Sequence, residues 1–218
     1  MPEAVIFDLD GVLMDSEQLW NQAKEELTRS GGGRWRDDAP RAMMGMSSTE
    51  WAQYMHDELG VPLDPREISH KVVQRMEELY RERLPVLPGA LDVVRAVQKR
   101  WPLGLASSSN REIIELFLEL SGLDDAFKAT VSSEEVARGK PAPDVYLATA
   151  EQLGVDPRRC AAVEDSSNGI RSAATAGMAV IAVPNQHYPP EPDALALAAV
   201  TVPAIAGVTP GLVERLSS

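Results

Sequence analysis

The sequence predicts an α/β fold: a doubly wound, Rossmann-like parallel sheet with an all-helical segment inserted after the first strand. Short apolar, β-branched runs recur along the chain, and helical patterns separate most of them. This alternation is typical of parallel strands covered by helices on both faces. Residues 16–85 break the rhythm, because they have helix patterns and no convincing strand. We therefore expect a core of residues 1–15 and 86–218 and a helical cap of residues 16–85.

Five apolar runs are the expected strands of the core. They are residues 4–7, 103–106, 129–131, 161–163 and 180–183. The first run is apolar on both faces, which suits a strand buried inside a parallel sheet. The stretch from 185 to 203 is rich in proline and alanine. We expect it to be a loop with one weak strand.

Three stretches of residues 16–85 have helical spacing or helix-start residues. Ser47 with Glu50 matches a capping box, and Asp64 before Pro65 is a typical helix start. The first of the three stretches, before Ser47, has apolar residues on one helical face: Leu19, Trp20, Ala23 and Leu27. The last stretch, which starts at Asp64, has an apolar stripe at helical spacing that we interpret as core packing. Its members are Ile68, Val72, Val73, Met76, Leu79 and Tyr80.

The composition predicts an acidic, globular, cytoplasmic protein. The chain has 218 residues, 44% hydrophobic and 25% charged, with a formal charge of −12. Such a charge disfavours nucleic acid and anionic membranes as partners. With Cys160 as the single cysteine, no internal disulfide can form, which fits a reducing compartment. No apolar run is long enough to span a membrane, and Asp8 interrupts the early apolar run, so we expect no signal peptide.

Polar clusters follow four of the expected strands. Asp8 and Asp10 follow the first, the run 107–110 (Ser-Ser-Ser-Asn) follows the second, Lys140 follows the third, and the pair 164–165 (Glu-Asp) follows the fourth. In an open α/β sheet, ligands bind outside the carboxyl ends of the strands. Each cluster alone could be a turn or a helix start. Four in order are hard to explain in that way, so we expect them to meet at one edge.

This convergence predicts a site for a metal ion and a phosphate. Two carboxylates about 4 Å apart repel by about 4 kcal/mol at an effective dielectric of 20, and a divalent cation removes that repulsion. Oxygen ligands without His or Cys favour Mg²⁺. Ser107 and Lys140 offer a hydroxyl donor and a positive charge, which suit a phosphate. We expect Asn110 to cap the following helix, so that its N-terminal amides also face the anion.

The four clusters together resemble the motifs of the haloacid dehalogenase-like hydrolase superfamily. The match covers nearly the whole chain, and residues 16–85 resemble the α-helical cap of that family. The first motif matches Asp8-Leu9-Asp10-Gly11-Val12-Leu13 with Asp15-Ser16-Glu17, the second Ser107, the third Lys140-Pro141-x-Pro143, and the fourth Glu164-Asp165-Ser166-x-x-Gly169.

The resemblance implies a chemical role for each acidic residue. Asp8 would be the nucleophile that forms an aspartyl-phosphate. Asp10 would be the general acid that protonates the leaving oxygen and then the base that activates water. Mg²⁺ would be held by an Asp8 oxygen, the backbone carbonyl of Asp10 and Asp165, and Glu164 would help directly or through water.

The resemblance also implies how the substrate is bound. Ser107, the Ser108 amide and Lys140 would hold the phosphoryl oxygens, beside the helix that begins at Asn110. The substrate would be a small phosphorylated metabolite such as a sugar phosphate. We expect a monomer, with a dimer as the alternative.

Three activities remain open among proteins of this kind, and a phosphatase is preferred. Relatives that cleave carbon–halogen bonds or phosphonates resemble the chain at Asp8 but lack an aspartate at the position of Asp10. The alternative, β-phosphoglucomutase, has a histidine where this chain has Trp20, and an arginine after a Gly-x-Ser stretch that is absent after residues 45–48 here. A non-catalytic phosphate-binding protein is the third possibility, which the intact Asp8 and Asp10 argue against.

Substrate choice is expected to depend on the helical cap. Candidate lining residues are Trp20, Met43, Met44, Gly45 and Met46. The Trp20 ring could pack on a sugar ring or within the first cap helix. The methionines favour an adaptable apolar surface, which suggests broad substrate tolerance.

Overall fold

One parallel sheet forms the centre of the computed structural model, which describes residues 1–44, 46–186 and 188–216. Within these ranges the strand order is β3-β2-β1-β4-β5-β6. The strands are β1 (Ala4–Phe7), β2 (Leu103–Ser107), β3 (Phe127–Ser132), β4 (Cys160–Glu164), β5 (Ala179–Ala182) and β6 (Val200–Thr201). The predicted α/β fold is confirmed, and the predicted strands differ from these only at their ends.

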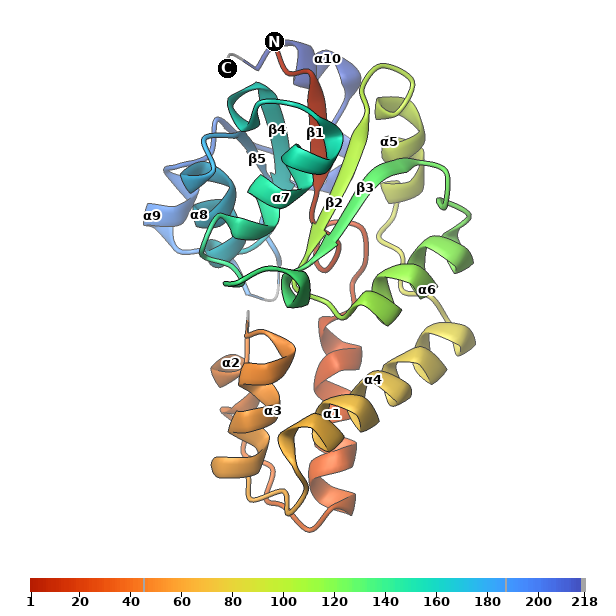
Figure 1. Cartoon of the computed structure of the whole chain (residues 1–218), viewed down its shortest axis with the longest axis vertical. Coiled ribbons are helices and arrows are strands. Elements are labelled where there is room, and N and C mark those ends of the chain that lie inside the picture. The colour runs from red at the N-terminus through yellow and green to blue at the C-terminus, as the bar shows by residue number, and fades with distance from the viewer. Residues whose placement is uncertain (45, 187, 217–218) are drawn as a thin grey trace.

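The strand order places β1 at the point where the sheet changes direction. From β1 the chain builds the sheet outward through β2 and β3, and then returns to add β4, β5 and β6 on the other side (Figure 1). Phe7, the last residue of β1, pairs with Leu105 of β2 and Val163 of β4. A crevice opens beyond the carboxyl ends of strands at such a switch point, and Asp8 is the next residue.

Helices cover both faces of the sheet because side chains of a strand alternate between its faces. Val5 and Phe7 of β1 belong to one hydrophobic cluster, and Ala4 and Ile6 to the other. The first cluster includes residues of α5 (Ala90–Val97), α6 (Arg111–Ser121) and α10 (Pro210–Glu214). The second includes residues of α7 (Asp144–Leu153), α8 (Ser167–Thr175) and α9 (Pro192–Leu195). The sheet is therefore doubly wound, as predicted.

Between β1 and α5, the described residues form four helices, and we call residues 16–85 the helical insert. They are α1 (Glu17–Ser30), α2 (Ala39–Ala42), α3 (Ser48–Asp57) and α4 (Pro65–Glu82). The insert lies beyond the carboxyl ends of the strands, where α4 packs against α6 (Figure 1). Its residues in the described part of the chain contribute no strand to the sheet.

The local signals that predicted the insert helices are present in the structure. Ser47 and Glu50 form both hydrogen bonds of a capping box at the start of α3. The Asp64 side chain accepts a hydrogen bond from the Arg66 amide at the start of α4. The predicted apolar stripe of α4 is buried at all six positions.

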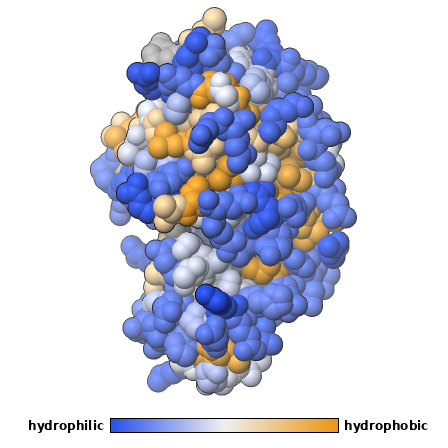
Figure 2. All heavy atoms as spheres, in the orientation of Figure 1, coloured by the Kyte–Doolittle hydropathy of each residue, from blue (hydrophilic) through white to orange (hydrophobic). Residues whose placement is uncertain are grey.

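The proline- and alanine-rich stretch contains one element that we did not predict. The short β6 matches the weak strand expected there, but α9 begins at Pro192 within the predicted loop. Proline at the first helical position loses no hydrogen bond, which explains this start. The face shown in Figure 2 is mostly hydrophilic, with apolar residues among the polar ones. In the described ranges, no helix has the length and apolar content needed to cross a membrane.

Candidate active site

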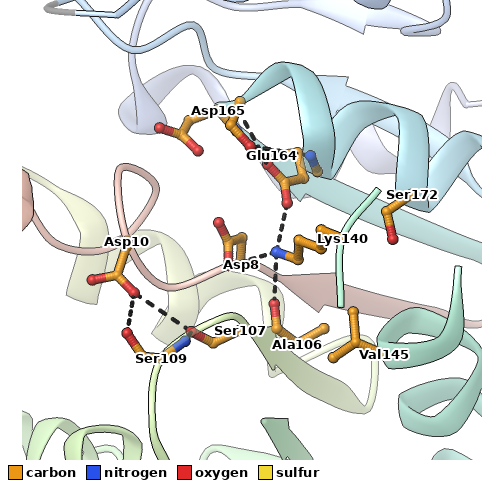
Figure 3. Close-up of polar contacts among 12 residues, drawn as sticks. Asp8, Asp10, Ala106, Ser107, Ser109, Lys140, Val145, Glu164, Asp165 and Ser172 are labelled. Carbon is orange, nitrogen blue, oxygen red and sulfur yellow. Dashed lines mark hydrogen bonds and ion pairs between the residues drawn. The ribbon is translucent and has the colours of Figure 1, made fainter. Parts of the chain in front are cut away.

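A cavity of about 160 Å³ lies between the carboxyl edge of the sheet and the helical insert. Asp8, Lys140 and Asp165 line it from the core, and Trp20 and Trp51 line it from the insert. The structure therefore brings together residues that are far apart in the sequence, at the edge where they were expected. Figure 3 shows the polar contacts of the core residues.

Lys140 is a buried cation that contacts residues at the carboxyl ends of β1, β2 and β4. Its Nζ lies 2.8 Å from Asp8 Oδ1 and 2.7 Å from Glu164 Oε1, and it donates to the Ala106 carbonyl at 3.1 Å (Figure 3). Burial alone lowers the pKa of Lys140, but the charges of Asp8 and Glu164 outweigh burial and raise it above its usual value. Lys140 is therefore fixed in its charged form beside Asp8.

Glu164 is fully buried and both of its oxygens accept hydrogen bonds. Oε1 accepts from Lys140 and from the Tyr146 hydroxyl at 2.9 Å. Oε2 accepts from the Asp165 amide at 2.9 Å and from the Ser166 amide at 3.2 Å. A Cβ added at Gly169 would lie 1.7 Å from Oε1, so only glycine fits at this motif position. This arrangement suits a carboxylate that positions Lys140.

Three buried carboxylates come close enough to share a metal ion. Asp8, Glu164 and Asp165 each offer an oxygen, and these oxygens lie within 4.8 Å of one another. Burial raises the pKa of Asp8 to about 7, and the charges of Glu164 and Asp10 add to this while Lys140 opposes it. Burial, followed by the charge of Glu164, also raises the pKa of Asp165 well above its usual value. A divalent cation would stabilise the charged form of these buried carboxylates, so the donor set fits Mg²⁺.

The Asp10 carboxylate lies apart from this cluster. It accepts hydrogen bonds from Ser16 Oγ, from Ser109 Oγ at 2.6 Å and from Trp20 Nε1 at 3.4 Å. Figure 3 shows it directed toward the serines that follow β2, whereas Asp8 is directed toward Lys140. The two aspartates of the motif therefore have different surroundings, which suits two different chemical tasks.

The serines at the carboxyl end of β2 form a hydrogen-bonded turn beside the cavity. Ser107 is fully buried, and its Oγ accepts from the Ser109 amide at 3.0 Å. Ser107 Oγ also lies 3.5 Å from Asp10 Oδ2. Ser108 and Ser109 line the cavity.

Asn110 lines the cavity, but the prediction that its side chain caps α6 was wrong. It occupies the N-cap position without a side-chain capping hydrogen bond. Its Oδ1 instead accepts from Ser48 Oγ at 2.9 Å, and its Nδ2 donates to Glu134 Oε1 at 2.7 Å. Because these partners satisfy both ends of the amide, Asn110 links the helical insert to the core.

The helical insert supplies the opposite wall of the cavity. Trp20, Met44 and Met46 line it as expected, whereas the predicted Gly45 lies outside the described residues. The Trp20 ring also packs within the insert, at a centroid distance of 6.2 Å from Trp51 of α3. Its packing on a sugar ring stays a prediction. The methionines and tryptophans make this wall partly apolar.

Sequence reasoning assigned no place in the cavity to two charged residues of this wall: Glu17, which it named only as part of the first motif, and Lys24, which it did not single out. Burial raises the pKa of Glu17 to about 7 and lowers the pKa of Lys24 to about 8. Both line the cavity together with Trp20. Their spacing along α1 places them on the face that contains Trp20, and this was the signal that could have found them.

Comparison with known proteins shows the family. Residues 2–177 match the model of the haloacid dehalogenase-like hydrolases. Hexitol phosphatase B of Escherichia coli is 37% identical over 187 residues, 83% of each chain. The phosphorylated carbohydrates phosphatase of Thermotoga maritima is 34% identical over 178 residues, 81% of this chain and 82% of that one. The chain belongs to the haloacid dehalogenase-like hydrolase family, and its phosphatase relatives support a phosphoric ester hydrolase.

The fold comparison agrees with the sequence comparison. The crystal structure of CbbY from Rhodobacter sphaeroides in complex with phosphate has a TM-score of 0.85 to this chain. The two are 26% identical, and the match covers 94% of this chain and 96% of that one. The similarity therefore includes the helical insert as well as the sheet.

Proposed function

We propose that the protein is a Mg²⁺-dependent phosphatase that hydrolyses a small sugar phosphate or similar metabolite through an aspartyl-phosphate on Asp8. The observation that carries this proposal is the buried Asp8 carboxylate, 2.8 Å from Lys140 Nζ, at the wall of a cavity of about 160 Å³. A cavity of about 150 Å³ admits a ligand such as benzene, so this one suits a small substrate. The phosphatase relatives support the same substrate class.

Asp8 is the proposed nucleophile. The Lys140 contact orients its carboxylate through Oδ1 and offsets negative charge on both the carboxylate and the incoming phosphate. Attack of an Asp8 oxygen on phosphorus forms the aspartyl-phosphate as the bond to the leaving oxygen breaks. Ser107, the Ser108 amide and Lys140 are proposed to hold the phosphoryl oxygens during this step.

Asp10 is the proposed proton-transfer residue. Hydrogen bonds from Ser16, Ser109 and Trp20 fix its carboxylate in place at the cavity wall. When protonated, it can donate to the leaving oxygen. Once ionised, it can take a proton from the water that hydrolyses the aspartyl-phosphate.

Asp8, Asp165 and the backbone carbonyl of Asp10 are the proposed Mg²⁺ ligands. When bound there, the ion supplies positive charge that stabilises the phosphoryl oxygens in the transition state. We propose that Glu164 acts through Lys140, because both Glu164 oxygens already accept hydrogen bonds.

Trp20 supports hydrolysis over the mutase alternative. The mutase has a histidine at this position, and an imidazole can both donate and accept a proton. The indole Nε1 of Trp20 can only donate, and it lies 3.4 Å from Asp10 Oδ1. Trp20 can therefore orient Asp10 but cannot replace the histidine in proton transfer.

Phosphate release from a panel of phosphate monoesters tests the proposed function. The panel contains sugar phosphates, phosphoglycolate, nucleotides and p-nitrophenyl phosphate, each with Mg²⁺ and with a chelator. We expect release that requires Mg²⁺, with sugar phosphates among the preferred substrates. Conversion of β-glucose 1-phosphate to glucose 6-phosphate with little free phosphate would instead establish the mutase.

A further inference from the structure

Lys24 is a buried cation of the helical insert that no proposed catalytic step uses. It lies on α1 with 6% of its surface exposed and lines the cavity. Its Nζ lies 4.9 Å from the ring centroid of Trp51 and 5.6 Å from that of Trp20. Within the described residues, the structure gives the ammonium no hydrogen bond and no ion pair.

An ammonium in this position needs hydrogen-bond acceptors. Lysine has three N–H donors, and a substrate that fills the cavity would displace water from them, which is costly unless the substrate supplies acceptors. The two tryptophan rings offset part of that cost through cation–π contacts, but a ring face does not replace three acceptors. Because Lys24 lines the cavity, a bound substrate is placed to supply the missing oxygens.

The neighbours of Lys24 indicate which kind of substrate oxygen would accept hydrogen bonds from its ammonium. Glu17 precedes Lys24 on the same face of α1, and the Asp10 carboxylate, which accepts a hydrogen bond from Trp20 Nε1, also lines the cavity and acts on the Lys24 charge. A second phosphate near Lys24 would meet two carboxylates and one ammonium, so it would be repelled. Hydroxyl groups can accept from Lys24 and donate to Glu17, and the faces of Trp20 and Trp51 can pack on the carbon atoms that bear them.

We propose that Lys24, together with Glu17, binds hydroxyl groups at the end of the substrate remote from its phosphate. The pair thereby selects monophosphates of neutral, polyhydroxylated chains or rings over bisphosphates. This inference rests on the proposed phosphatase activity at Asp8. Lys24 is then a specificity-determining residue and takes no part in breaking the P–O bond.

The test compares Lys24→Met with Lys71→Met, a matched substitution of an exposed lysine on α4. The substrates are sorbitol 6-phosphate, fructose 1,6-bisphosphate and p-nitrophenyl phosphate, which lacks the remote hydroxyl groups. Because Lys24→Met removes a hydrogen bond to a charged group, we expect it to lower kcat/KM for sorbitol 6-phosphate by about 10- to 100-fold relative to kcat/KM for p-nitrophenyl phosphate. We expect wild-type protein and Lys71→Met to share one substrate ranking, with the monophosphate above the bisphosphate.

Stability measurements show whether the substitution acts through folding. Methionine is similar in length to lysine and removes a buried charge, so the Lys24→Met unfolding temperature should equal or exceed that of the wild type. A second variant, Lys24→Gln, keeps a donor and should retain an intermediate preference for sorbitol 6-phosphate.

Three results would overturn the proposal while leaving the phosphatase in place. Lys24→Met could lower kcat/KM equally for every substrate, or change none of them. The wild type could instead prefer the bisphosphate and lose that preference in Lys24→Met, which would mean that Lys24 binds an anion. A wild type that releases phosphate from no substrate with Mg²⁺ would reject the proposed function itself, and this inference with it.

Discussion

Ser48 Oγ of α3 donates a hydrogen bond of 2.9 Å to Asn110 Oδ1 at the start of α6. Both residues are more than nine-tenths buried, so this contact joins the helical insert to the core at the edge of the cavity. Asn110 continues the link into the core through its hydrogen bond to Glu134. The contact holds the insert over the cavity, where closure would shield an aspartyl-phosphate from water.

Replacing Ser48 with alanine is therefore expected to loosen the insert. A buried acceptor left without its donor costs about 1–3 kcal/mol, so the free energy of unfolding should fall by that amount. KM should rise about 3- to 10-fold, in line with a hydrogen bond worth about 0.5–1.5 kcal/mol. Chemical denaturation measures the free energy of unfolding, and steady-state kinetics measure KM. Thr49→Ala is the control at the exposed neighbouring position, and equal behaviour of the two variants would reject the link.

Asp8→Asn is expected to abolish turnover and leave the fold intact. An amide is not a nucleophile toward phosphorus, so kcat should fall by about 10⁴-fold or more. Phosphate release with Mg²⁺ measures the loss, and circular dichroism checks the fold. An Asp8→Asn variant that retains full activity would remove Asp8 as the nucleophile.

The difference in stability between this variant and the wild type should also depend on pH. Burial raises the folded-state pKa of Asp8 from 3.8 to about 7, so the folded protein binds this proton more tightly than the unfolded chain. The stability from this group is present below pH 3.8 and is lost as pH rises toward 7. Asparagine does not titrate, so in chelator the unfolding free energy of Asp8→Asn should rise relative to wild type between these values. A constant difference would contradict the shift.

Lys140→Ala is expected to weaken phosphate binding and the fold together. The substitution removes the cation between Asp8 and Glu164, and breaking a buried ion pair costs about 3–5 kcal/mol. Affinity for orthovanadate, measured by competition, should fall at least about 30-fold. Lys71→Ala, at an exposed position, should change neither quantity. Unchanged vanadate affinity in folded Lys140→Ala would contradict the proposed role.

Gly169→Ala tests the packing that supports Lys140. The new Cβ would lie 1.7 Å from Glu164 Oε1, an atom already held by Lys140 and Tyr146. We expect a loss of about 1–3 kcal/mol in stability, as for other overpacked sites, and reduced kcat. Gly211→Ala is the control, because its Cβ would meet only Arg215 Nη1 at 3.6 Å. Wild-type stability and kcat in Gly169→Ala would show that Glu164 can move freely.

The fold and the core of the site could be predicted because they depend on local patterns. Apolar runs fix the strands, and the switch point of a parallel sheet brings the residues after them to one edge. Asp8, Lys140 and Asp165 lie together for this reason. Buried helix stripes such as that of α4 were predictable in the same way.

The parts that could not be predicted depend on contacts between distant elements. Asn110 has the sequence context of a helix cap, but Ser48, 62 residues away, and Glu134 take up its side chain. Lys24 resembles any lysine of an exposed helix until Trp51 of α3 is placed over it. Neither partner can be found from helical periodicity, because periodicity describes one element at a time.

Trapping the phosphorylated protein shows whether Asp8 is the nucleophile. The Asp10→Asn variant, given ³²P-labelled p-nitrophenyl phosphate and Mg²⁺, should form the aspartyl-phosphate because the leaving group needs no acid. The variant should hydrolyse the aspartyl-phosphate slowly, because it lacks the base that activates water. After acid quench, we predict close to one label per chain, in the peptide that contains Asp8, and none in Asp8→Asn. Steady turnover by Asp10→Asn without bound label, or label that persists in Asp8→Asn, would show that the reaction does not pass through an aspartyl-phosphate on Asp8.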